Sequence, residues 1–348
     1  MKSKRILIGV LNWGLGHATR SIPLIHALIN QKYEPVIASD GAAGQLLRRT
    51  FPDLEYIELP AYRVHYPSSG FLLPFSLAFQ GLGAFRVFHE ERRLTGQLIK
   101  KYHIDGIISD NRPGIFFPGV PSVYLTHQLR VLSGIFTPFT TRLHRHLFKN
   151  FNEIWVPDFE NPPYFSGILG HVEKKMNKVK YIGILSRFEY RNEVPDEDID
   201  WLIILSGPEK QRTVLERRIV ENYKFFQGKT VLVRGILTSM PIESPPDWKI
   251  ISFADTLTLS RLIISAKKLI LRGGYSSIMD LVALRKKAVL IPTPGQKEQE
   301  YLARYLDRKR YFPCIRQRKI HEISRINWDE YALPSMNTKM LLNFKIFA

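Results

Sequence analysis

Short apolar runs alternate with longer amphipathic stretches along most of the chain. In the amphipathic stretches, apolar residues recur at helical spacing. Ile278, Leu281 and Val282 are an example, and Arg285, the next position of this pattern, is expected to face solvent. The apolar runs read as strands at Ile6–Leu11, Pro35–Ser39, Gly106–Ser109, Val123–Thr126, Ile154–Pro157, Leu202–Ser206, Thr230–Arg234, Leu269–Leu271 and Ala288–Ile291. Strands rich in Val, Ile and Leu that alternate with helices predict parallel sheets built from βαβ units.

A break in this pattern divides the chain. Residues Ser186–Asp200 are charged, contain a proline and have almost no aliphatic side chains, and a new apolar run begins at Trp201. Such a segment is typical of a linker between domains. We expect an N-terminal α/β domain at 1–185, a hinge at 186–200, a C-terminal α/β domain at 201–325 and a tail at 326–348 whose placement the weak periodicity leaves open.

Composition adds one strong feature, a net charge of +18. It indicates an acidic partner, which could be nucleic acid, a phosphorylated substrate or an anionic membrane surface. The single cysteine, Cys314, excludes an internal disulfide framework and a multi-cysteine metal site. The apolar run at Ile6–Leu11 is too short for a signal peptide. Ser68–Phe85 is too interrupted, by Pro74, Gln80, Gly81 and Gly83, for a confident spanning helix.

The first glycine-containing loop reads LNWGLGHATR and follows the first predicted strand. Gly14 and Gly16 permit a tight turn and a close approach to a ligand, and the helix behind them offers N–H groups for an anion. Since Pro23 fits best near a helix start, His17 is expected in the loop or the first turn. His17 and Arg20 are then expected to project toward the carboxyl edge of the sheet.

Two other interpretations of this loop stay open. A dinucleotide fingerprint needs a third glycine where Thr19 stands, but Asp40 at the end of the second strand is a possible ribose-binding acid, so a dehydrogenase is weakened and not excluded. The glycines can also form a plain βα turn that His17 caps.

The C-terminal half carries a stronger constellation. A strand ends in Arg272-Gly273-Gly274, a helix is expected to open near Ser276 or Ser277, and Asp280 follows on its first turn. The next strand runs into Pro292–Gly295, followed by Gln299-Glu300 on another helix. Backbone N–H groups and Arg272 suit a diphosphate, Asp280 suits ribose hydroxyls, and Gln299 with Glu300 suit sugar hydroxyls.

Each of these residues also has a structural interpretation. Ser277 and Asp280 fit a capping box, and Gln299 with Glu300 fit a solvated helix face. Their order and spacing at strand ends together favour a nucleotide-sugar site, because ligand sites gather polar groups there.

The segment from Phe253 to about Ala303 resembles the C-terminal domain of glycosyltransferase family 28, and the first glycine loop resembles that family moderately. The family includes the enzyme that adds N-acetylglucosamine to the lipid-linked peptidoglycan precursor, and the monogalactosyldiacylglycerol synthases. The resemblance puts the family's ribose acid on Asp280, its sugar-contacting pair on Gln299 and Glu300, and its base-contacting backbone near Phe253. It puts the first C-domain loop, a poorer match, on Ser206-Gly207-Pro208-Glu209.

The resemblance implies the GT-B architecture, with two Rossmann-like domains that face each other across a cleft and the donor in the C-terminal domain. It also implies a hexosyltransferase that uses a nucleotide sugar, here expected to be a UDP-sugar, with no cofactor and no metal. A group of predicted glycosyltransferases whose first loop reads G-x-G-H-A-T-R is more similar still to Gly14–Arg20.

Glycosyl transfer needs a base for the acceptor hydroxyl, and three residues are candidates. His17 leads because of its motif and its intrinsic pKa near neutrality. Asp110, in ISDNRPG after another strand, is the rival base, and His127 is a third possibility with a positioning role.

Two apolar stretches with basic residues predict a membrane partner. Tyr62–Phe88 and Leu129–Phe151 mix aliphatic and aromatic residues with arginines, as interfacial segments do, although buried helices have a similar composition. Members of the resembled family glycosylate lipids. We therefore expect a lipid-linked acceptor, in glycolipid or cell-envelope polysaccharide synthesis, and a cytoplasmic protein held peripherally on the inner face of the membrane.

Two further classes of function remain as alternatives. One is a nucleotide-sugar epimerase or hydrolase of the same fold. The other is a basic polyanion-binding protein, for which the spread of the basic residues and the lack of a nucleic-acid-binding motif give little support. No nucleic-acid partner is expected.

Overall fold

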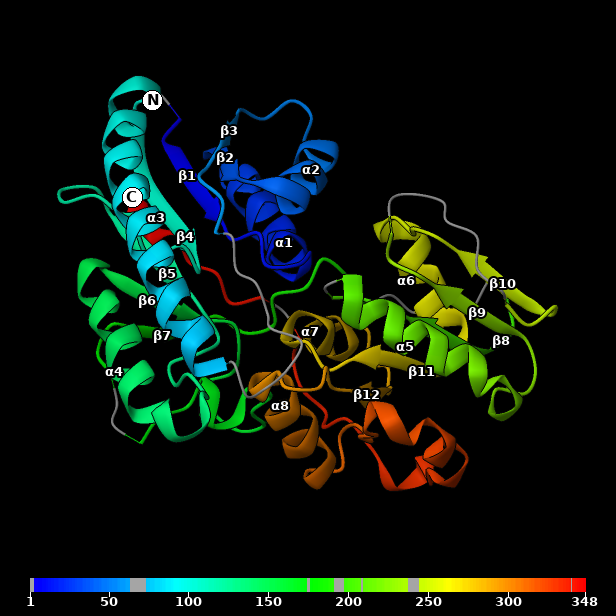
Figure 1. Cartoon of the computed structure of the whole chain (residues 1–348). Helices are drawn as coiled ribbons and strands as arrows, with labels where there is room; N and C mark the ends of the chain where they lie inside the picture. Colours follow the sequence, from blue (N-terminus) through cyan, green and yellow to red (C-terminus); the bar gives the residue numbers. More distant parts are fainter. Residues whose placement is uncertain are drawn as a thin grey trace. The chain divides into compact units, whose positions relative to one another are not determined.

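The computed structural model describes residues 3–62, 73–173, 176–190, 197–207, 209–236, 244–338 and 340–348; the side chains of 73–84 lie outside the description. The chain forms two compact units (Figure 1). Unit 1 comprises Met1–Leu185 together with Met340–Ala348, and unit 2 comprises Ser186–Lys339.

Unit 1 contains a parallel seven-stranded sheet of order β3-β2-β1-β4-β5-β6-β7. Its strands are β1 (Arg5–Val10), β2 (Glu34–Ser39), β3 (Tyr56–Glu58), β4 (Ile104–Asp110), β5 (Ser122–Leu125), β6 (Glu153–Val156) and β7 (Val179–Tyr181). Its helices are α1 (Gly16–Asn30), α2 (Gly41–Thr50), α3 (Leu73–Tyr102) and α4 (Thr137–Leu147), with short 3₁₀ helices η2 (Gly134–Phe136), η3 (Phe148–Asn150) and η4 (Gly167–Leu169).

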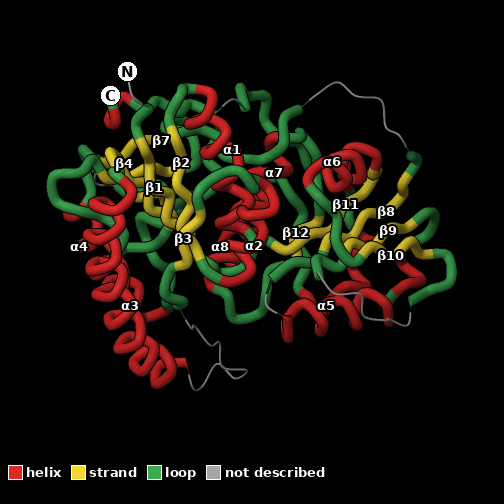
Figure 2. Tube along the Cα trace, turned by 90° about the horizontal axis from the view of Figure 1, so that it is seen from above, coloured by secondary structure: helices red, strands yellow, loops and turns green. Residues whose placement is uncertain are grey.

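Helices cover both faces of this sheet (Figure 2). Alternate residues of β1 point to opposite faces, so Ile6 and Ile8 pack with α1 and α2 while Leu7 packs with the end of α3. Burial on both faces explains why these strands are continuous apolar runs.

Unit 2 contains a parallel five-stranded sheet of order β10-β9-β8-β11-β12. Its strands are β8 (Ile199–Ile204), β9 (Thr230–Val233), β10 (Trp248–Ile251), β11 (Ala266–Arg272) and β12 (Val289–Ile291). Its helices are α5 (Glu209–Glu221), α6 (Thr256–Ser265), α7 (Tyr275–Ala283) and α8 (Lys297–Arg308), with η5 (Tyr223–Phe225), η6 (Gln317–Arg325) and η7 (Trp328–Glu330).

The last nine residues return to unit 1 and include the 3₁₀ helix η8 (Lys345–Phe347). Phe344 and Phe347 are buried in the unit 1 core, where their rings contact Trp155 and Tyr33. The backbone N–H of Leu341 donates to the carbonyl of Ile182. Part of the tail that the sequence left unplaced therefore completes the N-terminal core.

The two parallel sheets confirm the predicted pair of Rossmann-like domains. One local expectation was wrong, because Pro23 lies within α1 and not near its start. The helix tolerates the missing hydrogen bond because its apolar face, including Ile22, Leu24 and Ile25, is buried in the core. His17 consequently lies in the first turn of α1.

Candidate functional site

The first group of site residues lies where the strand order of unit 1 reverses. β1 and β4 are neighbours, but the chain leaves β1 toward β2 and leaves β4 toward β5. In open α/β sheets the carboxyl edge at such a switch point is where ligands bind. The loop with Gly14 follows β1 there, and Asp110 ends β4 opposite Val10.

His17 and Asp110 contact each other at this edge. The Nδ1 atom of His17 lies 2.9 Å from Oδ1 of Asp110. Asp110 is fully buried, whereas the His17 side chain is 13% exposed. We infer the tautomer of His17 from this hydrogen bond: Nδ1–H donates to the carboxylate, so Nε2 of the neutral ring carries no proton.

The surroundings keep His17 neutral and Asp110 ionised. Burial lowers the pKa of His17 below 6.5; Asp110 opposes this shift and Arg20 adds to it. Burial by itself raises the pKa of Asp110, but Arg20 and His17 outweigh it and hold that pKa at about 2. A carboxylate this acidic, with both oxygens paired, does not fit the rival role of general base for Asp110.

Arg20 and His127 support the same pair from within the protein. Arg20 Nε donates to Asp110 Oδ2 at 2.8 Å, Nη2 pairs with Oδ1, and Nη1 lies 3.2 Å from His127 Nδ1. Arg20 is 3% exposed. The sequence groups Gly14, Gly16, Arg20 and His127 as a loop for the acceptor or a phosphate, but the guanidinium of Arg20 is used inside the protein to hold Asp110.

Arg112 is a buried residue near the site that the sequence did not single out. Its guanidinium donates to Asp40 and Glu91, each at 2.6 Å, and contacts the carbonyls of Val10 and Pro60. Asp40 also accepts from Asn12 Nδ2 at 3.1 Å. Both carboxylate oxygens of Asp40 therefore have partners inside the protein. Asp40 is not available to bind a ribose, and the dehydrogenase interpretation loses its acid. Only the register of β4 places Arg112 there, so no local sequence signal marks it.

Gly14 makes the turn that leads into α1. Its φ of +74° lies in the left-handed region, which glycine adopts without steric cost. Leu15 is the N-cap, and Gly16 opens the helix. The loop thus has the conformation that the first glycine motif indicated.

The second group of site residues lies at the switch point of unit 2, between β8 and β11. Ser206 and Gly207 follow β8 in an exposed loop, and Gly207 has a φ of +96°. Gly273 and Gly274 follow β11, and Gly274 is the N-cap of α7. Nothing lies within 4 Å of where a Cβ of Gly207 or Gly274 would stand, so both backbones border open space. Pro208 lies outside the described residues.

Arg272 departs from its expected role. It is 1% exposed; Nη1 lies 2.7 Å from Oε1 of Gln317 and Nη2 lies 2.7 Å from the carbonyl of Gln211. Burial lowers its pKa to about 10. Arg272 therefore ties β11 to neighbouring segments and does not present a guanidinium fork to a diphosphate.

The structure also removes the capping-box interpretation of Asp280. Because α7 begins at Tyr275 after the N-cap Gly274, Ser276 and Ser277 belong to the first turn and Asp280 to the second. Asp280 Oδ1 instead accepts a 2.6 Å hydrogen bond from Ser186 Oγ. Burial raises the pKa of Asp280, against the effects of Arg187 and Ser186.

Arg187 is a second residue that sequence reasoning missed. Its Nε lies 3.9 Å from Oδ2 of Asp280, and its Nη1 lies 3.5 Å from Oγ1 of Thr256 at the start of α6. Nε is buried and has no hydrogen-bond partner among the described residues. The sequence placed Ser186 and Arg187 in a hinge, whereas they pack on α6 and α7.

Gln299 and Glu300 hold the loop after β12. Oε1 of Gln299 accepts from the N–H of Thr293 and Oε1 of Glu300 accepts from the N–H of Gly295, both at 2.9 Å. Their acceptor atoms are thus used internally. Among the described residues, the hydrogen bond of Gln299 uses Oε1 only, so Nε2 is available to a sugar hydroxyl.

Phe253 lies in the loop between β10 and α6, directly before Ala254 and the N-cap Asp255. The Asp255 carboxylate accepts from the N–H of Thr258 at 2.8 Å. The loop therefore ends at a capped helix start at the same edge of the sheet as Gly273 and Gly274.

Within the described ranges, no group of three or more His, Cys, Asp or Glu residues has a geometry that could hold a metal ion. The linker does contain Asp-x-Asp triplets within Asp196–Asp200. Asp198 and Asp200 pair with Lys267 at the amino end of the sheet, opposite the candidate site, and Asp196 lies outside the described residues.

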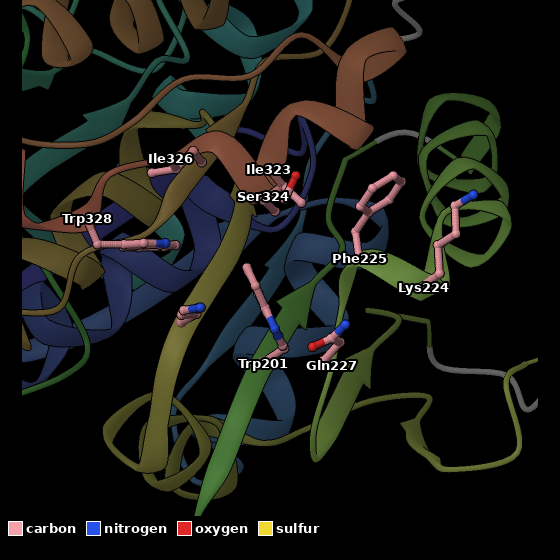
Figure 3. Close-up of a pocket in the computed structure, with 9 residues that line it drawn as sticks. Trp201, Lys224, Phe225, Gln227, Ile323, Ser324, Ile326 and Trp328 are labelled. Carbon is pink, nitrogen blue, oxygen red and sulfur yellow. The ribbon is translucent and has the colours of Figure 1, made fainter.

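A pocket of about 410 Å³ lies at the amino half of β8 (Figure 3). It is lined by Trp201, Lys224, Phe225, Gln227, Lys268, Ile323, Ser324, Ile326 and Trp328. None of the residues singled out from the sequence lines this pocket, so it is separate from the candidate donor site. None of the helices that the structure describes has the length and apolar character needed to cross a membrane.

Comparison with known proteins finds similarity to glycosyltransferases. Residues 231–329 match the glycosyltransferase family 28 C-terminal domain. The chain is 24% identical over 302 residues to an uncharacterized glycosyltransferase of Methanopyrus kandleri, covering 82% of each chain. It is 22% identical over 337 residues to an uncharacterized glycosyltransferase of Methanosarcina mazei, covering 88% of this chain and 84% of that protein.

Solved structures share the whole two-unit fold. Spinosyn rhamnosyltransferase SpnG has a TM-score of 0.64 at 15% identity, covering 92% of this chain and 90% of its own. MurG of Acinetobacter baumannii has a TM-score of 0.56 at 11% identity, covering 92% and 89%. SpnG has also been solved in complex with thymidine diphosphate, with a TM-score of 0.61 at 15% identity over 89% of this chain and 86% of its own.

Proposed function

We propose that this chain, a family 28-like glycosyltransferase with the GT-B fold, transfers a hexosyl group from a UDP-sugar to a hydroxyl of a lipid-linked acceptor. The observation that carries the proposal is the contact of His17 with buried Asp110 at the switch point of unit 1. It joins a neutral imidazole to the orienting carboxylate that a general base requires.

In the proposed reaction, Nε2 of His17 takes the proton from the acceptor hydroxyl as the hydroxyl oxygen attacks the anomeric carbon. The bond from that carbon to the diphosphate oxygen breaks, and UDP leaves. Asp110 keeps the ring oriented and stabilises the imidazolium that forms, since it is ionised and bonded to Nδ1. Arg20 in turn fixes Asp110.

The donor is proposed to bind at the switch point of unit 2. The amino-terminal end of α7 suits a diphosphate through its helix dipole, and the backbone at Gly274 borders open space beside it. Arg187 supplies the cation that Arg272 does not, and Asp280 receives the ribose hydroxyls. Phe253 contributes backbone to the base, and Gln299 donates to the sugar.

No resident cofactor or metal enters the proposed mechanism. The helix dipole of α7 and the guanidinium of Arg187 neutralise the departing diphosphate. We therefore expect turnover to persist when a chelator removes divalent cations.

The lipid-linked acceptor and the location are supported by charge and by resemblance. The net charge of +18 favours an anionic surface, and members of the resembled family act on lipids. We place the protein peripherally on the cytoplasmic face of the membrane, and we propose no nucleic-acid partner. Of the two stretches that indicated membrane contact, the side chains of most of Tyr62–Phe88 lie outside the description, whereas Leu129–Phe151 is described.

Replacement of His17 tests the proposal. His17→Ala is expected to lower turnover with a lipid acceptor by about two to four orders of magnitude, the usual loss for a general base. Affinity for the UDP-sugar, measured by calorimetry, should stay unchanged because the donor residues belong to unit 2. Equal turnover in the variant and the wild type would remove His17 from the mechanism.

Product analysis with and without acceptor lipids separates this function from its alternatives. A transferase forms a glycosylated lipid and UDP in equal amounts. Free sugar and UDP formed at the same rate without acceptor would identify a hydrolase, and an isomerised nucleotide sugar would identify an epimerase.

A further inference from the structure

We propose that the outer face of α4 and the turn before it insert into the surface of an anionic lipid bilayer and so hold unit 1 on the membrane. This inference rests on the lipid-linked acceptor proposed above and assigns the membrane contact to particular residues. The face, called here the α4 face, consists of Ile135, Phe136, Phe139, Arg142, Leu143 and His146.

Large apolar side chains of the α4 face are open to solvent. Ile135 is 88% exposed, Phe139 68% and Leu143 57%. Phe139 and Leu143 are four residues apart and so lie in one row along α4, and Ile135 and Phe136 lie in η2 directly before this helix. Single exposed apolar residues are ordinary on a protein surface, but a row of this kind marks an interaction surface.

The opposite side of α4 is anchored in unit 1, so the face has a fixed direction. His144 and Phe148 pack their rings against Tyr124 of β5. Arg145 Nε donates to the carbonyl of Leu129 at 3.0 Å, and Thr141 Oγ1 accepts from the N–H of Val131 at 3.1 Å. No residue of α4 itself is buried, which shows that the helix lies on the outside of the unit.

The charges around this face select an anionic surface. Asn111–Asn152 contains no aspartate or glutamate, and the exposed cations Arg142 and Lys149 lie on or beside the face together with His146. Apolar side chains rimmed by cations are typical of segments that bind anionic lipid headgroups. The same charges disfavour a second copy, because two such faces in contact would place like charges together.

Vesicle sedimentation with paired variants tests this assignment. The full-length protein is expected to pellet with vesicles that contain phosphatidylglycerol, to pellet less as salt rises, and to stay in solution with phosphatidylcholine alone. Phe139→Ser/Leu143→Ser should weaken binding to the anionic vesicles at least tenfold. The matched control, Val214→Ser/Tyr223→Ser, removes two apolar residues of similar exposure from unit 2 and should bind as the wild type does.

The outcomes separate this inference from the proposed reaction. If the α4 variant pelleted like the wild type, the α4 assignment would be overturned. A wild-type protein that never pelleted would overturn the membrane contact, whereas transfer to a detergent-solubilised acceptor would still support the reaction. Light scattering that showed a dimer of the wild type and a monomer of the α4 variant would assign the face to a second copy instead. Both variants should keep the wild-type affinity for a UDP-sugar.

Discussion

His17 and Asp110 are separated by 93 residues and meet only because β1 and β4 are neighbours. The sequence favours His17 as the base, by its motif and its intrinsic pKa, with Asp110 as the rival. The structural argument against Asp110 comes from Arg20, a helical residue whose side chain turns inward to Asp110. Because a pKa depends on such tertiary partners, the roles within the pair became visible only in the structure.

Asp110→Asn tests the positioning role. Asp110 raises the pKa of His17, whereas burial and Arg20 lower it, so loss of the carboxylate should lower that pKa further. His17 is active when neutral, and activity falls as pH drops through its pKa. The acid limb of kcat/KM is therefore expected below pH 6.5 in the wild type and at still lower pH in the variant.

The plateau should also fall, by about two to four orders of magnitude, because the ring loses its orientation. The variant leaves Arg20 buried without its carboxylate, which costs about 3–5 kcal/mol, so circular dichroism must first show that it is folded. An unchanged acid limb in folded protein would contradict the link between Asp110 and His17.

Asp280→Asn tests the proposed ribose contact. The amide retains an acceptor for Ser186 but loses the charge, so UDP affinity by calorimetry is expected to fall at least tenfold with a small change in melting temperature. Ser186→Ala is the matched control, because it removes the hydrogen bond to Asp280 and leaves the acid. Equal losses in the two variants would make Asp280 only an anchor for the segment at Ser186.

At the scale of elements, the apolar pattern located central strands and missed three edge strands. β3, β7 and β10 each lie at the edge of a sheet and are only three or four residues long. An edge strand has one hydrogen-bonding neighbour and a partly exposed face, so it lacks the continuous apolar run of a buried strand. β12, also at an edge, was predicted because its three residues are buried.

Gly14 lies in a turn and Gly274 in the loop proposed to bind the diphosphate, so replacing each by alanine is expected to have a different effect. Gly14→Ala forces an alanine into a φ of +74° and should cost about 1–2 kcal/mol of unfolding free energy. Gly274→Ala adds a methyl group at a φ of −75° in open space, so stability should change by less than about 1 kcal/mol. Since that methyl group would stand where the diphosphate is proposed to bind, donor affinity should fall.

Chemical denaturation and calorimetry on both variants give this comparison. A Gly274→Ala protein that bound UDP as tightly as the wild type would place the diphosphate elsewhere. The prediction for Gly14 would fail if its variant were as stable as the wild type.

At the scale of the whole molecule, the tail was the least predictable part. Residues 340–348 have weak periodicity, and only tertiary packing brings Phe344 and Phe347 to Trp155. The sheet makes room for them at Gly106, where a Cβ would collide with the Phe347 ring. Such a match between a glycine and a distant aromatic ring has no local signature.

Removal of these rings should destabilise unit 1. Phe344→Ala and Phe347→Ala are each expected to cost about 3–5 kcal/mol of unfolding free energy, because each leaves a cavity in the core. Leu341→Ala, at a position 59% exposed, is the control and should change stability by less than about 0.5 kcal/mol. Thermal unfolding measures all three, and equal melting temperatures would contradict the packing.

The returning tail also sets an order for folding during synthesis. A ribosome makes the seven strands of unit 1 first, but Phe344 and Phe347 emerge only after the whole of unit 2. N-terminal domains usually fold first during translation at about 5–20 residues per second. These rings cover one face of β1 and β4. That face therefore stays exposed, and accessible to chaperones, until unit 2 has been synthesised. Unit 1 therefore reaches its final packing last, although its strands are synthesised first.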